Sequence, residues 1–196
     1  MGKIVVSTHL TLDGVMQAPG QPDEDTRGGF EHGGWQRQYA DQVMGAFIGQ
    51  AMASAGGMLL GRRTYENFAA FWPSQPSDNS IAQAINGSRK YVVSTRVKDP
   101  LEWSNSVLLS GDLADEVGRL RASEPKDLSV VGSGVLAQSL AKLGLVDEYD
   151  IFLHPLVLGS GNRLFEPGLP RTALQLVDTK TTTTGVVILV YRPAGS

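Results

Sequence analysis

The sequence contains no cysteine among its 196 residues, which excludes disulfides, thiolate metal sites and a cysteine nucleophile. It has only three histidines, at positions 9, 32 and 154, and none of them forms an i, i+4 pair that would suit a helical zinc site. We therefore expect no bound metal. No apolar run approaches the roughly 18 residues that cross a membrane. The first residues also lack the layout of a signal peptide, so we expect a cytoplasmic protein without membrane contact.

An excess of positive charge is missing as well. The chain carries 17 Lys and Arg against 20 Asp and Glu, with a net charge of −3. Nucleic-acid binding needs clustered cationic surface, so we expect no nucleic-acid partner. Hydrophobic residues make up 41% of the chain, which is typical of a globular protein. The length suits one domain, and no repeat or linker divides it, so we predict a single domain over residues 1–196.

What the sequence does contain is a regular alternation of strands and helices. The apolar patterns predict strands at 3–12, 58–60, 90–95, 107–109, 128–131, 148–154, 174–182 and 186–192. They predict helices at 35–53, 81–86, 112–122 and 135–143, and one more that starts within residues 61–64 and runs to 71. Such alternation favours an α/β fold with a mostly parallel sheet covered on both faces, and the last two strands favour an antiparallel hairpin. Residues 17–34 carry two prolines and five glycines, which indicates a long functional or mobile loop.

The most informative stretch is 128–137, Leu-Ser-Val-Val-Gly-Ser-Gly-Val-Leu-Ala. A short apolar strand ends in a turn with two glycines, and a helix follows at once. The first turn of a helix has unpaired N–H groups and a partial positive charge, so it binds phosphate well. Gly132 and Gly134 allow a sharp turn and a close approach of a ligand to the backbone.

Other strand ends carry similar signals, in a fixed order along the chain. Leu12-Asp13-Gly14 follows the first strand, and Gly61-Arg62-Arg63-Thr64-Tyr65-Glu66 follows the second. Val93-Ser94-Thr95-Arg96 ends the third, and Leu158-Gly159-Ser160-Gly161-Asn162 comes after residues 148–154. In an open α/β sheet ligands bind beyond the carboxyl ends of the parallel strands, where we expect these junctions to meet.

These motifs, together with Phe71-Trp72-Pro73 and Leu164-Phe165, resemble the dihydrofolate reductase superfamily along essentially the whole chain. The resemblance is closer to the reductase domain of riboflavin biosynthesis and its stand-alone homologues. It implies a dihydrofolate-reductase-like three-layer sandwich with a mostly parallel central sheet and an antiparallel C-terminal hairpin. It also implies a homodimer and an NADPH-dependent reductase that transfers hydride to a ribosylaminopyrimidine-like or pterin-like small molecule, of the 5-amino-6-(5-phosphoribosylamino)uracil reductase type.

The resemblance also implies where NADPH binds. The pyrophosphate and the adenosine phosphate map to the start of the second helix, the 2′-phosphate to the end of the third strand, and the nicotinamide to the first strand. The implied cofactor residues are Thr8, His9, Gly61, Arg62, Arg63, Thr64, Ser94, Thr95, Arg96, Gly132, Ser133, Gly134, Val135 and Leu136. Arginine suits a phosphate because its planar fork binds two oxygens at once.

Plainer interpretations of the same residues stay open. Gly61 and Gly132 also fit ordinary turns, and Arg62 and Arg63 fit a solvated helix start, although cations are unfavourable at that end of a helix. The two histidines of the strands, at 9 and 154, fit structural roles. Core or dimer packing suits Trp72 and the helix aromatics.

The chemistry beside the cofactor is less defined. Dihydrofolate reductases use a carboxylate on the first helix, whereas the corresponding stretch here, residues 43–46, has none, and Asp41 is one turn away. Folate reduction is therefore not expected. Asp13 is the candidate catalytic residue, as proton donor or to order a water. Arg37 and Arg163 are candidates for a substrate phosphate, and the 17–34 loop is a candidate lid.

Two other classes of function fit parts of the sequence. Residues 132–137 match the G-x-G-x-x-G/A pattern of a Rossmann dehydrogenase, but only about 60 residues follow, too few for the rest of that fold. A nucleotide-binding homologue without catalysis is the other alternative, and the missing helix carboxylate motivates it. Preference for NADPH over NADH, followed by turnover, would distinguish the three.

Overall fold

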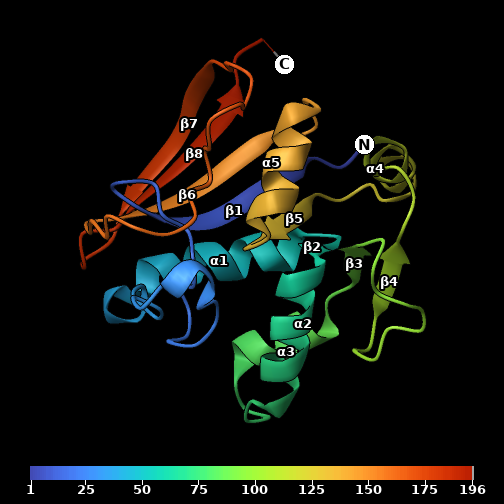
Figure 1. The fold of residues 1–196 in the computed structure, drawn as a ribbon, viewed down its shortest axis with the longest axis horizontal. Helices are drawn as coiled ribbons and strands as arrows, with labels where there is room; N and C mark the ends of the chain where they lie inside the picture. Colours follow the sequence, from blue (N-terminus) through green and yellow to red (C-terminus); the bar gives the residue numbers. More distant parts are fainter. Residues whose placement is uncertain (196) are drawn as a thin grey trace.

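An eight-stranded sheet forms the centre of the molecule, and helices flank it on both faces (Figure 1). The structure is a computed structural model that describes residues 1–195. The strands are β1 (Ile4–Thr11), β2 (Gly57–Gly61), β3 (Lys90–Val93), β4 (Ser106–Leu109), β5 (Leu128–Val131), β6 (Glu148–His154), β7 (Leu174–Thr181) and β8 (Val187–Pro193). Across the sheet their order is β4-β3-β2-β5-β1-β6-β8-β7.

The first six strands run parallel, so their carboxyl ends share one edge of the sheet. β1 pairs in parallel with β5 and β6, β2 with β5 and β3, and β3 with β4. β8 is antiparallel to β6 and to β7 and closes the sheet with a hairpin. This confirms the predicted α/β fold, with a mostly parallel sheet and an antiparallel C-terminal hairpin. It does not have the 3-2-1-4-5-6 strand order of a Rossmann domain.

Within residues 1–195, five α-helices accompany the strands: α1 (Gln42–Ser54), α2 (Arg62–Phe71), α3 (Ser80–Gly87), α4 (Leu113–Ser123) and α5 (Gly134–Lys142). Three short 3₁₀ turns lie at Arg27–Gly29 (η1), Arg37–Tyr39 (η2) and Trp72–Ser74 (η3). α4 and α5 pack on one face of the sheet, and α1, α2 and α3 on the other. The molecule therefore has three layers.

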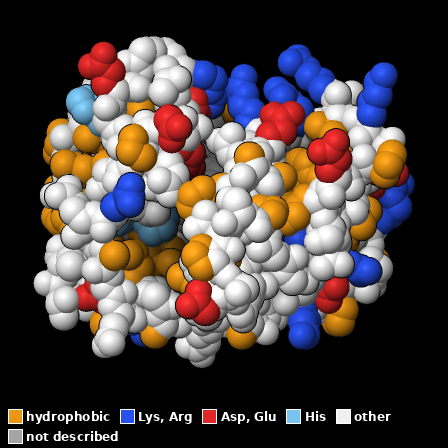
Figure 2. Space-filling model, turned by 90° about the horizontal axis from the view of Figure 1, so that it is seen from below, with side chains coloured by type: hydrophobic (Ala, Val, Ile, Leu, Met, Phe, Trp, Pro, Cys, Tyr) orange, Lys and Arg blue, Asp and Glu red, His pale blue; other side chains and the backbone are white. Residues whose placement is uncertain are grey.

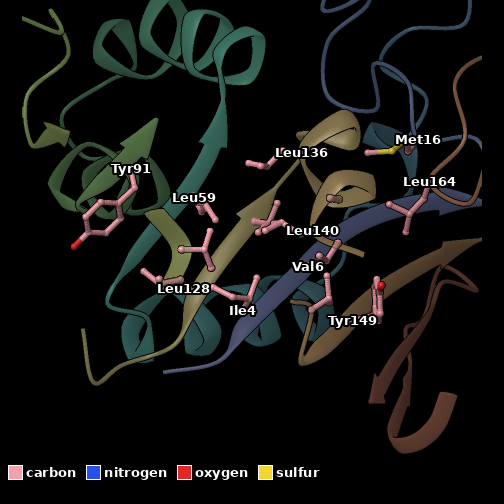
Figure 3. Close-up of a cluster of buried hydrophobic side chains, with 14 of the residues drawn as sticks. Ile4, Val6, Met16, Leu59, Tyr91, Leu128, Leu136, Leu140, Tyr149 and Leu164 are labelled. Atoms are coloured by element: carbon pink, nitrogen blue, oxygen red, sulfur yellow. The ribbon is translucent and has the colours of Figure 1, made fainter. Parts of the chain in front are cut away.

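The largest core lies between the sheet and the α4/α5 layer. Side chains of β1, β2, β5 and β6 meet Leu136 and Leu140 of α5, as Figure 3 shows. Alternate residues of a strand point to opposite faces, so Ile4 and Val6 enter this core while Val5 and Ser7 point to the other side. Two smaller cores on that other side bind α1 to Phe152 and α2 to Met58 and Leu60.

The first predicted helix is shorter than expected. The sequence predicted a helix over 35–53, but α1 begins at Gln42, and only the 3₁₀ turn η2 precedes it. The cause is Asp41, which adopts an extended conformation and accepts hydrogen bonds from Val43 N and Met44 N, so it caps the helix. Trp35 lies outside the helix, and its indole N–H donates to Gln17 O at 2.8 Å.

The expected long loop, residues 17–34, is held by its own contacts. Phe30 and Trp35 form a small core with Val15 and Ala18. The Gln17 amide donates to the carbonyls of Asp25 and Arg27, at 3.1 and 3.0 Å. Asn67 of α2 donates to Glu24 O at 3.0 Å and ties the loop to the helix. The loop is therefore an ordered wall beside the sheet.

Candidate functional site

A cleft of about 740 Å³ lies between α1, α2, the 17–37 segment and the adjoining face of the sheet. Its walls are mostly apolar, and polar groups from Ser7, His9 and Ser129 stand in its floor. Figure 2 shows hydrophobic side chains gathered in the hollows of the face seen from below. An apolar cleft of this size with a few convergent polar groups is typical of a small-molecule site. The apolar side chains of its walls are Met44, Phe47, Ile48, Met52, Phe68, Phe71 and Trp72.

Three of the predicted cofactor residues, Thr8, His9 and Gly132, line this cleft, and Arg37 lines it as well. Asp13, Arg163 and the remaining predicted positions lie outside its lining. Sequence reasoning missed the aromatic wall, because it assigned Trp72 and the helix aromatics to core or dimer packing. Their spacing on α1 and α2 predicts one apolar face, but periodicity does not distinguish a face that packs from one that lines a cavity.

The two glycine turns after β2 and β5 meet at one edge of the cleft. Gly61 N donates a hydrogen bond of 2.9 Å to Ser133 Oγ, across 72 residues of sequence. Gly132 has φ +68°, and a Cβ at this position would lie 3.2 Å from Thr64 Cγ2. A Cβ at Gly134 would lie 2.8 Å from Met16 Sδ. Gly132 therefore needs glycine for its left-handed conformation, whereas a side chain at Gly134 would displace only the flexible end of Met16.

The helices that begin at these turns differ from the others at their first residue. Among the helices of residues 1–195, α1, α3 and α4 are capped by the side chains of Asp41, Asn79 and Asp112. α2 and α5 have no side-chain cap, because Gly61 has no side chain and the Ser133 hydroxyl accepts from Gly61 instead. Both N-termini thus keep free N–H groups side by side, an arrangement suited to an anion.

The arginines at the start of α2 have different surroundings. Arg62 forms an ion pair with Glu66 one turn later, at 2.8 Å, so its charge is already compensated. Arg63 is exposed and has no ion pair within the described part of the chain. Of the two, Arg63 is therefore the freer to meet a phosphate.

Ser94, Thr95 and Arg96 lie beside the start of α2, since Val93 pairs with Gly61 in the sheet. The Ser94 hydroxyl accepts from Arg96 N at 3.0 Å and Val97 N at 3.2 Å, which shapes a tight turn. That turn leaves Thr95 and Arg96 exposed. In the α5 turn, Val135 is exposed, whereas Leu136 is buried in the main core and offers only its backbone.

Asp13 joins two loops. Its carboxylate accepts from Thr11 Oγ1 at 2.6 Å, Gly159 N at 2.9 Å and Leu158 N at 3.2 Å. These bonds, with the Thr11 hydroxyl foremost, lower the pKa of Asp13 from 3.8 to about 2. Arg163 adds a 2.8 Å bond from Nε to Asp13 O. A carboxylate this acidic is ionised at neutral pH, which favours a positioning role and disfavours proton donation.

His9 and His154 form a pair within the sheet. His9 Nδ1 and His154 Nε2 are 2.9 Å apart, and the His9 ring stacks on Phe152 with centroids 4.7 Å apart. His154 is fully buried, with the rings of Trp35 and Tyr39 packed against it. Burial, together with repulsion from His154, lowers the pKa of His9 to about 3, and burial lowers the pKa of His154 to about 4. Both rings are neutral at physiological pH.

The first helix offers no carboxylate to the cleft. α1 has the sequence Gln-Val-Met-Gly-Ala-Phe-Ile-Gly-Gln-Ala-Met-Ala-Ser. Asp41, one residue before it, spends Oδ1 on the helix cap and accepts from Thr183 N and Oγ1 at its other oxygen. α1 therefore has no side chain that could act as the helix carboxylate does in dihydrofolate reductases.

Residues 1–195 lack both a metal-binding cluster and a membrane-spanning helix. No group of three or more His, Asp or Glu side chains is placed to hold a metal ion. None of the helices in that range has the length and apolar character needed to span a bilayer.

Comparison with known proteins agrees with the architecture. The RibD C-terminal domain family model matches residues 2–188. The chain therefore belongs to the RibD C-terminal domain family, a group of dihydrofolate-reductase-like reductase domains. The uncharacterised protein YyaP of Bacillus subtilis is 26% identical over 193 residues, which cover 96% of this chain and 94% of YyaP.

Solved structures show the same fold at lower identity. A putative riboflavin biosynthesis protein from Shewanella sp. PV-4 superposes with a TM-score of 0.73 at 21% identity, covering 97% of this chain and 98% of the other. A pyrimidine reductase-like protein from Corynebacterium diphtheriae gives 0.65 at 11% identity, covering 100% and 93%. Dihydrofolate reductase from Enterococcus faecalis, complexed with NADP(H) and RAB-propyl, gives 0.63 at 13% identity, covering 98% and 97%. The fold is thus that of dihydrofolate reductase, as the sequence predicted.

Proposed function

We propose that this protein is an NADPH-dependent reductase that transfers hydride to a pyrimidine-like or pterin-like small molecule. The observation that carries the proposal is the pair of uncapped helix N-termini where the β2–α2 and β5–α5 turns meet. Their free N–H groups suit a pyrophosphate, and Gly132 lines the cleft beside them. Family membership supports the same function.

The residues around these turns fit the charges of the cofactor. Arg63 and Arg96 are exposed, lie on neighbouring junctions of the sheet and form no ion pair within residues 1–195. In this proposal Arg63 meets the pyrophosphate and Arg96 the 2′-phosphate, beside Thr95. When bound, the nicotinamide supplies the hydride, and the chain's task is to position it and to exclude water.

The substrate lies in the apolar cleft in this proposal. Flat aromatic rings suit walls made of Phe47, Phe68 and Trp72. In this proposal Arg37, which is exposed and lines the cleft, meets a substrate phosphate. The loop wall around Glu24 completes the enclosure, and burial raises the pKa of the Glu24 carboxyl there. We propose a positioning role for Asp13, because its carboxylate holds the loop at 158–159 against the end of β1.

Gly132→Ala tests the cofactor site against a matched control. The new methyl group lies 3.2 Å from Thr64 Cγ2 and presses on Thr64, a residue of the proposed cofactor site. Gly144→Ala imposes a similar left-handed strain, at φ +66° against +68°, but has open space around it. We expect the Gly132 variant to lose NADPH binding by at least about tenfold, measured by fluorescence, and the Gly144 variant to bind as the wild type does. Equal affinities in all three proteins would contradict the proposed site.

A non-catalytic nucleotide-binding protein is the second candidate, favoured by the absence of a carboxylate on α1. The distinguishing assay mixes the protein with NADPH and a panel of pyrimidines and pterins, and follows the loss of NADPH absorbance. Turnover supports the reductase, whereas tight NADPH binding without turnover of any compound supports the second candidate.

A homodimer is also part of the proposal. β7 is the last strand of the sheet and pairs only with β8 among residues 1–195, and Leu176 and Val177 on it are exposed. Such an edge is suited to association with another chain. Light scattering after gel filtration tests it, and a monomer at micromolar concentration would refute it.

A further inference from the structure

The His9–His154 pair leaves one buried ring nitrogen, His154 Nδ1, without a hydrogen-bond partner among the described residues. The pair shares one hydrogen bond, between His9 Nδ1 and His154 Nε2, and a neutral imidazole has one donor and one acceptor nitrogen. His154 Nδ1 is buried without a hydrogen-bond partner. His9 Nε2 forms no hydrogen bond with the described residues either, but His9 is part of the cleft floor.

Two proton arrangements satisfy the shared bond. In the first, His154 carries its proton on Nε2 and donates to His9 Nδ1, so the proton of His9 is on Nε2. In the second, His9 donates from Nδ1, and the proton of His154 is on the buried Nδ1. The second leaves a buried N–H without a conventional acceptor, which is rarer in proteins than an unpaired lone pair. The aromatic rings of Trp35 and Tyr39 beside His154 offer at most a weak acceptor.

The first arrangement determines what the cleft presents to a ligand. The His9 ring is held by its bond to His154 and by its stack on Phe152, so its orientation is fixed. Its Nε2 lies across the ring from the bonded Nδ1 and belongs to the side chain that lines the cleft. The hydrogen bond made by one nitrogen of a histidine sets the protonation of the other.

We infer that His154 locks His9 as a neutral N–H donor in the cleft floor, where it selects ligands that place a carbonyl oxygen or ring nitrogen against Nε2. The identity of the ligand rests on the proposed function, since the nicotinamide carboxamide and a pyrimidine or pteridine ring both carry such acceptors. His9 contacts the ligand, and His154 is a positioning residue.

Nuclear magnetic resonance of the histidine rings tests the lock without any ligand. Long-range ¹H–¹⁵N correlation separates the tautomers, and with three histidines in the chain, His32→Phe assigns the exposed one. We expect His9 and His154 both to carry a single proton on Nε2 near neutral pH. A proton on His154 Nδ1, or a charged ring at either position, overturns the inference. This result does not depend on whether the protein binds NADPH.

Ligand binding tests the selection. His9→Phe keeps the ring and its stack on Phe152 but removes the donor, His9→Gln restores a side-chain N–H, and His32→Phe is the control away from the cleft. We expect His9→Phe to weaken binding by about tenfold and His9→Gln to recover part of it. His154→Phe leaves the cleft lining intact but removes the bond that fixes the His9 tautomer. We expect it to weaken binding of the same ligand, because His9 then populates both tautomers.

Binding measurements with two ligands, NADPH and lumazine, distinguish whether the acceptor belongs to the cofactor or to the substrate. A loss confined to NADPH assigns the nicotinamide carboxamide, and a loss confined to lumazine, a neutral pteridine with ring carbonyls, assigns the substrate. Wild-type affinity of His9→Phe for both ligands overturns the inference. Failure of the wild type to bind either one counts against the proposed function, and the tautomer measurement then decides the lock alone.

Discussion

Asp150 has a buried carboxyl, and we predict that replacing it with asparagine destabilises the fold at low pH and stabilises it at high pH. It lies on β6 with an exposed fraction of 5%, and its Oδ1 has no hydrogen-bond partner. Burial foremost, and then the charge of Glu148, raises its pKa from 3.8 to about 7, although Lys3 and Arg192 oppose the rise. The folded chain therefore binds this proton more tightly than the unfolded chain does.

Proton linkage determines whether the buried carboxyl makes the fold more or less stable as the pH rises. Between about pH 4 and pH 7 the folded state holds more protons than the unfolded state, so the stability of the wild type falls as the pH rises through this range. The full cost of the buried charge is present above pH 7. A pKa change of this size corresponds to about 4 kcal/mol at the upper limit, at about 1.4 kcal/mol for each pH unit.

Asp150→Asn removes the charge but keeps the shape. The amide introduces buried N–H groups without ready partners, at a cost of about 1–2 kcal/mol that does not depend on pH. We therefore expect the variant to be less stable than the wild type by about 1–2 kcal/mol at about pH 4, and more stable by about 2 kcal/mol at about pH 8. Urea unfolding followed by fluorescence of the three tryptophans measures both.

The control is Asp178→Asn, an exposed carboxylate on β7 paired with Lys180, for which we expect only a small change at either pH. The reasoning about Asp150 is refuted if the stability difference between wild type and Asp150→Asn is the same at both pH values. That result would mean that the carboxyl ionises in the folded chain as readily as in water.

Three further predictions concern the site. Arg96→Ala should weaken NADPH binding by about tenfold and leave NADH binding unchanged in titrations of both cofactors, and equal losses would argue against a 2′-phosphate contact. Asp13→Asn should lower the free energy of unfolding by about 1–2 kcal/mol, because it weakens charge-assisted bonds to the 158–159 backbone, and should leave the pH profile of turnover unchanged. A proton donor is active only while it is protonated, so a variant profile that lost its alkaline limb would restore Asp13 as proton donor. Asn67→Ala removes the 3.0 Å bond to Glu24 O, so amide exchange in residues 17–34 should speed up while global stability changes by less than about 1 kcal/mol; unchanged exchange would show that the small core of the loop holds it alone.

The sheet and the glycine turns could be predicted from the sequence because their signals are local. The apolar run at 128–131 and the two glycines after it indicate a strand and a tight turn without knowledge of any other segment. The parallel order then requires the junctions to meet at one edge. The bond between Gly61 and Ser133 was not predictable, because it depends on two turns that are 72 residues apart. It is also what leaves α5 without a cap.

The cleft walls were beyond sequence reasoning for a related reason. Whether Phe47 or Trp72 packs in a core or lines a cavity depends on how closely α1 and α2 approach the sheet, which no local pattern sets. The start of the first helix was predictable in principle, because Asp41 before an apolar periodic stretch is a common N-terminal cap. The periodicity of residues 39, 43, 47 and 51 extended the expected helix beyond that signal.

The strand at 148–154 shows how much a sequence can indicate about such interior groups. A parallel strand next to the middle of a sheet is covered on both faces, so its side chains are expected to be apolar. Asp150 and His154 break this pattern, and alternation places both on the α1 face with Phe152. Buried polar groups are retained at a cost, so each exception marks a place to look for function. The register of β1 against β6 sets His9 opposite Phe152 and diagonal to His154. Only this register shows that His154 has a hydrogen-bond partner at the cleft, His9, whereas Asp150 does not.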